Sequence, residues 1–191
     1  DLPAEASPVI VPEVVFPTQG QLIVREMEIP QSIASFGLPG LKRHDPDFFA
    51  AYVMNQVFGS SGFTSRLTNE VREKRGLTYG VFTYLASYDL AELFQGSVAS
   101  ANDRIGEAIT VIQAEWVKLA DKGVTEDELE AAKKFLTGAY PLRFDGNGRI
   151  ASILAGMQLD DLPISYIETR NDQVNAVTLE DVARVAKRLM K

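Results

Sequence analysis

The pattern of apolar and polar positions predicts two pairs of strands, each followed by helices, and a long helical region at the end of the chain. Strands are indicated where β-branched and aromatic side chains mix with polar ones over short runs. Four segments fit this pattern: 21–29, 31–38, 79–88 and 92–100. Only three residues separate the last two segments, so the pattern predicts that they pair antiparallel.

Apolar residues at helical spacing predict helices between and after these strands. Asp45 and Pro46 are typical of a helix start, with an N-cap followed by proline at the first helical position. Thr125 and Glu128 have the spacing of a capping box, and Thr178 caps the last helix. The predicted helices cover 45–58, 65–76, 104–120, 125–139, 147–158, a short segment after Pro163, and 178–189. Runs of strands followed by runs of helices indicate an α+β fold, with an antiparallel or mixed sheet and helices packed on one face.

The first twenty residues differ in composition from the rest of the chain. They hold four of the nine prolines, and proline fixes φ and lacks an N–H, which predicts an extended segment. We therefore expect 1–20 to be a linker or a strap along a surface, preceded by another part of the protein. The remaining residues, 21–191, are enough for a single α+β module with its own core.

Composition excludes several classes of chemistry. The chain has no cysteine and one histidine, which excludes a thiol nucleophile, a disulfide and a zinc site built on thiolates or a histidine pair. The net charge of −7 argues against nonspecific binding to nucleic acid or to an anionic membrane surface. No apolar run has the length of a transmembrane helix. We expect no cofactor and no metal in this chain, no nucleic-acid partner and no membrane partner.

Three small groups of residues have a functional and a structural interpretation, and the structural one is favoured for each. The stretch 59–62 (GSSG) lacks the spacing of a phosphate-binding loop and follows a helix, so it is interpreted as a helix–helix connection. His44 lies beside Asp45 and Asp47, but these carboxylates fit a helix start better than a metal site. The acidic residues within 126–130 complement the dipole of their helix.

Four cationic residues lie close together in the second predicted helix. Residues 66–75 carry four positive and two negative charges in a chain that is acidic as a whole. A solvated helix face is the ordinary explanation of such a cluster, so charge alone assigns no function to it. The residues are Arg66, Arg72, Lys74 and Arg75.

Two stretches, 61–67 (SGFTSRL) and 71–79 (VREKRGLTY), closely resemble the second module of insulinase/pitrilysin-type zinc peptidases. These are the inverted zincins, which include the mitochondrial processing peptidase. The similarity continues through 123–129 (GVTEDEL) and 138–142 (GAYPL), and it covers most of 21–190. Within the family, the chain most resembles the bacterial two-subunit, processing-protease-like branch.

The resemblance implies two related α+β modules that close around a chamber. One module carries H-x-x-E-H and a distal glutamate, which bind zinc and supply the general base, and the other supplies an arginine and a tyrosine that reach the substrate. At the family's spacing this pair falls on Arg72 and Tyr79, and the zinc motif is absent, so the chain resembles the zinc-free half. Arg66 is expected to be structural. The segment 31–36 resembles the family's edge strand near the substrate, and no residue in it is singled out.

The chemistry of the pair is consistent with this role. Arg72 lies near the end of a helix that Gly76 terminates, and Tyr79 opens the next strand, so a short turn can bring both side chains to one edge. Peptide hydrolysis places negative charge on the carbonyl oxygen. A guanidinium and a phenol O–H are donors that can meet this charge or hold the backbone beside it.

The leading hypothesis is the substrate-binding, non-zinc half of a zinc metalloendopeptidase, inactive as an isolated chain. The implied partners are a peptide substrate and an H-x-x-E-H module, in the same chain or as a separate subunit, and zinc is expected in that module. The alternative is a catalytically inactive structural or assembly subunit of the same family. A third hypothesis, a phosphate-binding domain, would rest only on the GSSG stretch at 59–62. We expect the isolated chain to self-associate as a homodimer through a partly apolar face on the side of the Arg72 helix, which is meant for its partner, and the family suggests the bacterial periplasm.

Overall fold

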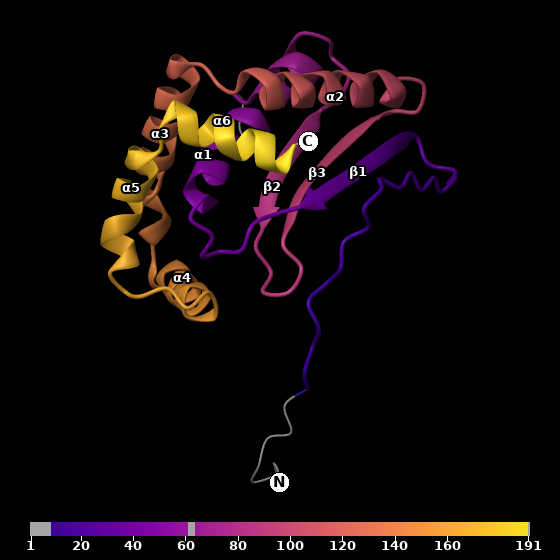
Figure 1. The fold of residues 1–191 in the computed structure, drawn as a ribbon. Helices are drawn as coiled ribbons and strands as arrows, with labels where there is room; N and C mark the ends of the chain where they lie inside the picture. Colours follow the sequence, from indigo (N-terminus) through magenta and orange to yellow (C-terminus); the bar gives the residue numbers. More distant parts are fainter. Residues whose placement is uncertain (1–8, 61–63, 191) are drawn as a thin grey trace.

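The computed structural model describes residues 9–60 and 64–190, which form a small sheet and a layer of helices (Figure 1). The strands are β1 (Gln31–Pro39), β2 (Gly80–Ala86) and β3 (Leu93–Ala101). The helices are α1 (Phe48–Phe58), α2 (Ile105–Lys122), α3 (Glu126–Ala139), α4 (Asn147–Leu159), α5 (Tyr166–Ala176) and α6 (Leu179–Leu189). Two shorter elements are η1 (Thr68–Glu73), which is π-helical, and the 3₁₀ turn η2 (Pro141–Phe144). This is the predicted α+β arrangement.

The three strands pair antiparallel in the order β1-β3-β2. β2 and β3 form a hairpin in which Ala86 lies opposite Leu93. β1 pairs with the other edge of β3, with Gln31 opposite Ala101. The predicted hairpin is confirmed, and the sheet is antiparallel throughout. β3 is central, so its backbone groups are paired on both edges.

One face of the sheet packs against helices through an aromatic cluster around Trp116 of α2. The Trp116 ring lies 5.5 Å from Phe58 of α1 and 5.6 Å from Phe94 of β3, measured between ring centroids. Its indole N–H donates a hydrogen bond to the carbonyl of Met190, just after α6. One side chain therefore connects the sheet to three helices, and buried aromatic area of this size contributes much of a small core's stability.

The opposite face of the sheet is open to solvent. Ile33 of β1 is 66% exposed, and Phe82 and Tyr84 of β2 are also exposed. The two rings of β2 lie side by side, with centroids 6.2 Å apart. An antiparallel sheet tolerates one solvated face, but contiguous apolar side chains on that face are typical of an interaction surface.

Helix α1 occupies the centre of the helical layer. It contacts α3, α5 and α6, and its residues from Val53 to Phe58 are all buried. In Figure 1, α3, α5 and α4 lie on the side of the molecule away from β1. Across the described part of the chain, no helix combines the length and the apolar character needed to cross a bilayer.

The helix boundaries predicted from capping chemistry are largely confirmed. Thr125 caps α3 in a complete capping box with Glu128, and Thr178 caps α6 in the same way with Asp181. Gly76 has φ of +58°, the left-handed conformation expected of a glycine that ends a helix. These signals involve residues that are close in sequence, so the packing of the rest of the chain does not change the helix boundaries that they set.

Three predictions about local structure were wrong in detail. Segment 21–29 forms no strand, and its apolar side chains are exposed because no neighbouring strand or core lies beside them. Helix α1 begins at Phe48, later than predicted; Asp47 is its N-cap residue, and Asp45 instead accepts a hydrogen bond from the Asp47 amide. The segment 65–76 is mostly the π-helix η1 rather than a regular α-helix.

The segment before β1 runs past the end of the sheet without regular secondary structure. Between residues 9 and 30 the structure has neither helix nor strand. Three contacts attach the segment: the Val14 amide donates to the carbonyl of Leu90, Glu13 pairs with Lys42 at 2.6 Å, and the Asn102 amide donates to the carbonyl of Ile29 at 2.9 Å.

An ion pair joins the residues just before η1 to the start of α3. The Arg66 guanidinium donates two hydrogen bonds of 2.6 Å to the Glu128 carboxylate and one of 2.9 Å to the carbonyl of Gly123. Burial alone would raise the pKa of Glu128, but the bonds from Arg66 and Thr125 outweigh it and lower that pKa. The expectation that Arg66 is structural agrees with this geometry.

We expect the Glu128→Gln variant to be less stable than the wild type at pH 7, by about 2 kcal/mol. The glutamine carbonyl oxygen can still accept from the Thr125 amide in the capping box, but the change removes the charge that Arg66 faces and one of the two acceptor oxygens that Arg66 uses. Because the pKa of Glu128 is lower in the folded state, its contribution is present above its ordinary value of 4.5 and is lost as pH falls through the folded value. The difference in the free energy of unfolding between the two proteins, measured by urea unfolding, should therefore be smaller at acidic pH than at pH 7. Glu130→Gln is the control, because the Glu130 side chain, which pairs with Lys133 on the same helix, is 66% exposed, and the change should alter stability by less than about 0.5 kcal/mol.

Candidate functional site

Arg72 and Tyr79 line one cavity of about 520 Å³ at an end of the sheet. Arg72 comes from η1, and Tyr79 is the residue before β2. Gln31 of β1 and Ala101 of β3 line the same cavity, so two of the three strands contribute residues to it. The Arg72 side chain is 36% exposed and Tyr79 is 88% exposed. The structure therefore brings the two residues singled out in the sequence to one solvent-accessible place.

The turn between Arg72 and Tyr79 is held in place by its contacts with the core. Gly76 takes the left-handed conformation that reverses the chain after η1. Leu77 is buried, its amide donates to the carbonyl of Val71, and its carbonyl accepts from the Ser100 hydroxyl. A buried anchor with both backbone groups paired leaves little freedom for the residues on either side.

Hydrogen bonds from the side chains of Thr78 and Arg104 also hold this turn. The Thr78 hydroxyl bonds to backbone groups of Gly80 and donates to the carbonyl of Ala99. Arg104, the N-cap residue of α2, donates to the carbonyl of Gly76 at 3.0 Å. Tyr79 is thus an exposed side chain on a constrained backbone, which is typical of a residue that contacts something outside its own fold.

The cations of 66–75 have different environments. Lys74 and Arg75 both pair with Glu70, at 2.5 and 2.7 Å. Their hydrogen bonds, that from Lys74 first, lower the pKa of the Glu70 carboxyl. Arg72 lies 3.5 Å from the carboxylate of Glu73, and it alone of the four borders the cavity. The positive cluster is therefore not one solvated face.

Sequence reasoning missed two members of this cavity. Arg104 adds a second guanidinium, and Gln31 adds an amide from the edge strand. Neither has a local signal, because each reaches the cavity only through strand pairing that brings distant segments together. A second cavity, lined by tyrosines and arginines, was also not predicted.

The described residues do not fit a zinc site. No group of three or more His, Cys, Asp and Glu side chains lies together in them. The His44 ring nitrogen Nε2 lies 2.9 Å from the carbonyl oxygen of Asp160. Asp45 and Asp47 both pair with Arg188 of α6, as structural carboxylates do. The candidate metal ligands of the sequence thus have structural partners within residues 9–60 and 64–190.

The remaining sequence candidates have structural roles or fall outside the described residues. Glu126, Asp127 and Glu128 lie in the first turn of α3, where they complement the helix dipole. In the stretch 59–62, Ser61 and Gly62 lie outside the described residues, and the Gly59 amide donates to a carbonyl of α1.

Comparison with known proteins identifies the family. The family model described as the peptidase M16 inactive domain matches residues 1–136. The chain belongs to the M16 inactive-domain family. Its fold and the resemblance found in its sequence agree with that membership.

Individual relatives of this M16 domain include proteins with different descriptions. An uncharacterised zinc protease of Streptomyces coelicolor is 30% identical over 87% of the chain, which spans 36% of that protein. A Helicobacter pylori protein described as a non-peptidase homologue is 27% identical over 80% of the chain, which spans 35% of that protein. The solved M16 inactive domain from Pseudomonas fluorescens superposes with a TM-score of 0.76 and 30% identity, over 84% of this chain and 38% of that one. The chain therefore spans less than half the length of these relatives.

We expect the purified chain, washed with chelator, to hold no stoichiometric zinc and to cleave no peptide. With one histidine and no cysteine, it lacks the ligands that bind zinc tightly in peptidases. Metal analysis by mass spectrometry, with a fluorogenic peptide assay, tests this. One tightly held equivalent of zinc together with peptidase activity would show that the chain is not a zinc-free half.

Proposed function

We propose that this M16 domain is the substrate-binding, zinc-free half of a zinc metalloendopeptidase, and that Arg72 and Tyr79 contact the peptide. The proposal rests on the shared cavity at the end of the sheet, which is lined by the Arg72 guanidinium and by the exposed Tyr79 phenol. Family membership supports the peptidase context, since zinc proteases are among the relatives.

The chemistry of the cavity suits a peptide backbone. A guanidinium stays charged at every accessible pH and presents several N–H donors in one plane, and a phenol adds one O–H donor. Such donors favour carbonyl oxygens, and they favour an oxyanion more strongly than a neutral carbonyl. The constrained turn from Gly76 to Tyr79 keeps the two donors in place before a peptide arrives, which lowers the ordering cost of binding.

The zinc and the general base belong, in this proposal, to an H-x-x-E-H module outside the described chain. That module is either another part of the same polypeptide or a separate subunit, and the two halves close around the peptide. The open sheet face, with Ile33, Phe82 and Tyr84, is the surface available for such a partner or for the substrate. The chain's own residues bind and orient the peptide and perform no metal chemistry.

A structural or assembly subunit is the second candidate function. The Helicobacter relative described as a non-peptidase homologue is the observation that favours it. A scaffold needs the folded domain and its interaction face, but it has no need of an exposed phenol beside a guanidinium. Activity measurements on variants of these two residues therefore separate the two candidates.

In the enzyme reconstituted with its zinc module, we expect Arg72→Ala and Tyr79→Phe each to lower kcat by roughly 100- to 1000-fold. Tyr79→Phe removes one hydroxyl from a side chain that is 88% exposed, so the melting temperature should be unchanged. The double variant should lose less than the product of the single losses, because both donors act on the same stretch of substrate. Steady-state kinetics and thermal unfolding of the same samples measure both effects.

Lys74→Ala is the matched control, because Lys74 lies on the same segment but pairs with Glu70 away from the cavity. It should leave kcat within about twofold of the wild type. Equal losses for Lys74→Ala and Arg72→Ala would point to general positive potential instead of a positioned pair. A fully active enzyme carrying both Arg72→Ala and Tyr79→Phe would favour the scaffold function.

We also expect the isolated chain to form a homodimer through its open sheet face, because no partner module covers that face. Sedimentation velocity at increasing concentration should show the dimer. Phe82→Ser should weaken it, while Phe135→Ser, an exposed apolar residue of α3 on another surface, should not. A monomer at every concentration would remove the reason to regard this face as an interface.

A further inference from the structure

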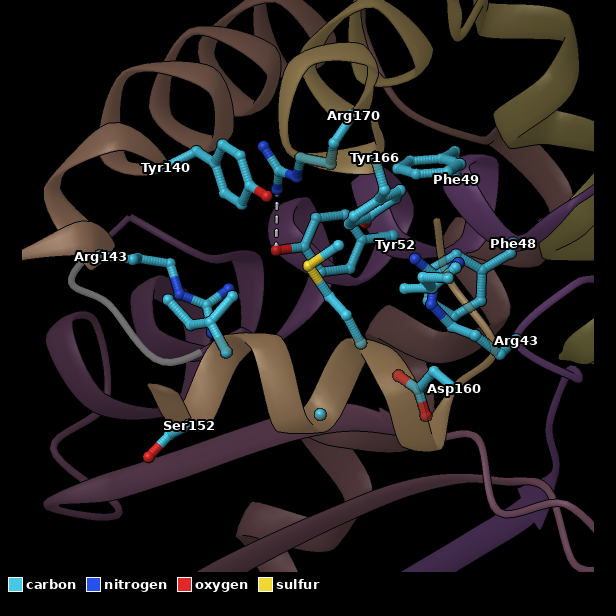
Figure 2. A pocket seen from close by; sticks show the side chains of 14 residues that line it. Arg43, Phe48, Phe49, Tyr52, Tyr140, Arg143, Ser152, Asp160, Tyr166 and Arg170 are labelled. Atoms are coloured by element: carbon cyan, nitrogen blue, oxygen red, sulfur yellow. Dashed lines mark hydrogen bonds between the residues drawn. The ribbon is translucent and has the colours of Figure 1, made fainter. Parts of the chain in front are cut away.

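A second cavity, of about 350 Å³, lies within the helical layer and shares no lining residue with the Arg72 cavity. Figure 2 shows its wall of tyrosine and arginine side chains, which come from the segment before α1, α1 itself, the junction of α3 with η2, and α5. The α4 side of the cavity is apolar, with Ile153 and Met157. The cavity therefore combines donors on one side with an apolar surface on the other.

Arg170 of α5 is a buried cation in the wall of this cavity. Its side chain is 3% exposed, and its guanidinium donates to the carbonyl of Leu136, the amide oxygen of Asn171 and the hydroxyl of Tyr52. The guanidinium carbon lies 4.6 Å from the ring centroid of Tyr140. These partners are neutral, so the described residues supply Arg170 with no carboxylate. A buried positive charge without a counter-ion favours an anion nearby.

Tyr140 presents an unused donor at the same place. The residue is 7% exposed, and its hydroxyl has no hydrogen-bond partner among the described residues. In Figure 2 this hydroxyl points toward the centre of the cavity, close to Arg170 and the hydroxyl of Tyr52. Burial raises the pKa of Tyr140, and also that of Tyr166 in the same wall, so both phenols remain protonated donors well above neutral pH. A buried hydroxyl without a partner is unfavourable unless a ligand or solvent satisfies it.

Two more arginines flank the cavity. Arg143 of η2 is exposed, lies on the Tyr140 side in Figure 2 and forms no ion pair among the described residues. Arg43 stacks over the ring of Phe48, 4.1 Å from its centroid, at the other end. The one acidic side chain in the lining is Asp160, which is exposed at the end of α4 beside Arg43. The end of the cavity near Tyr140 and Arg143 is therefore positive and rich in donors.

We propose that this cavity binds a small organic carboxylate with an apolar body. The carboxylate accepts hydrogen bonds from the Tyr140 hydroxyl and the Arg143 guanidinium, and it balances the charge of Arg170. The apolar body packs against Ile153 and Met157. A monoanion fits this donor set better than a phosphate dianion, because only one of the three guanidiniums is both exposed and unpaired, and because the apolar wall gives a second charge no partner.

Benzoate and benzamide are the probes, because they share shape and differ in charge. For a ligand of this size we expect isothermal titration calorimetry of the 191-residue chain to give a Kd of about 1 mM for benzoate. Benzamide should bind at least roughly tenfold more weakly, because it presents no anion to the arginines. Equal affinity for the two would mean that the cavity is merely apolar. Absence of benzoate binding at about 10 mM, or phenyl phosphate binding more tightly than benzoate, would also overturn the proposal.

Variants of the two proposed donors test the placement. Tyr140→Phe removes only the unpartnered hydroxyl, so it should weaken benzoate roughly tenfold without lowering the free energy of unfolding. Arg143→Met should weaken benzoate by a similar factor, and as an exposed residue it keeps the test valid if the first variant is unstable. Arg149→Met is the control, because Arg149 lies on α4 outside the lining and should leave the affinity unchanged. Unchanged affinity in Tyr140→Phe and Arg143→Met would place the ligand elsewhere.

Discussion

The packing of Trp116 against one face of a three-stranded sheet is the interaction on which the rest of this fold depends. The central strand β3 has hydrogen-bonding partners on both edges, so its stability depends on burying one of its faces. Trp116 reaches Phe94 of that face, Phe58 of α1 and the backbone after α6. The opposite face of the sheet stays open to solvent, and the cavity lined by Arg72 and Tyr79 lies at the end of the same sheet.

The cavity at the end of the sheet differs from the helical side in how its residues are held. On the helical side, aromatic side chains fix each other by contact. At the cavity, the backbone is fixed instead, through Gly76, Leu77 and Thr78, and the side chains are left accessible. This division lets Tyr79 be almost fully exposed and still be placed accurately, which is the property expected of a group that meets a ligand.

Much of the fold could be predicted from the sequence because its signals are local. The capping boxes at Thr125 and Thr178 depend on residues three positions apart, and the β2–β3 hairpin depends on a short connection. Segment 21–29 has a strand-like composition, but a strand also needs a partner, and nothing in a local pattern reveals whether one exists.

The two cavities differ in predictability for the same reason. Arg72 and Tyr79 are near neighbours in sequence and carry a family pattern, so they were found, although their role rests on the proposal above. Arg104 and Gln31 reach the same cavity only through strand pairing. Arg170 and Tyr140 meet because α5 packs against the end of α3, and a buried arginine or tyrosine has no distinctive signature in a single sequence.

The order of strands in the sheet has a consequence for how the cavity is assembled. Ala86 pairs with Leu93 seven positions away, whereas Pro39 pairs with the same residue across 54 positions. Closing the longer loop costs about 2 kcal/mol more in chain entropy, so the hairpin can close well before β1 docks. Since β1 contributes Gln31 to the lining, the cavity that holds Arg72 and Tyr79 is complete only after the strand with the costliest loop closure has docked.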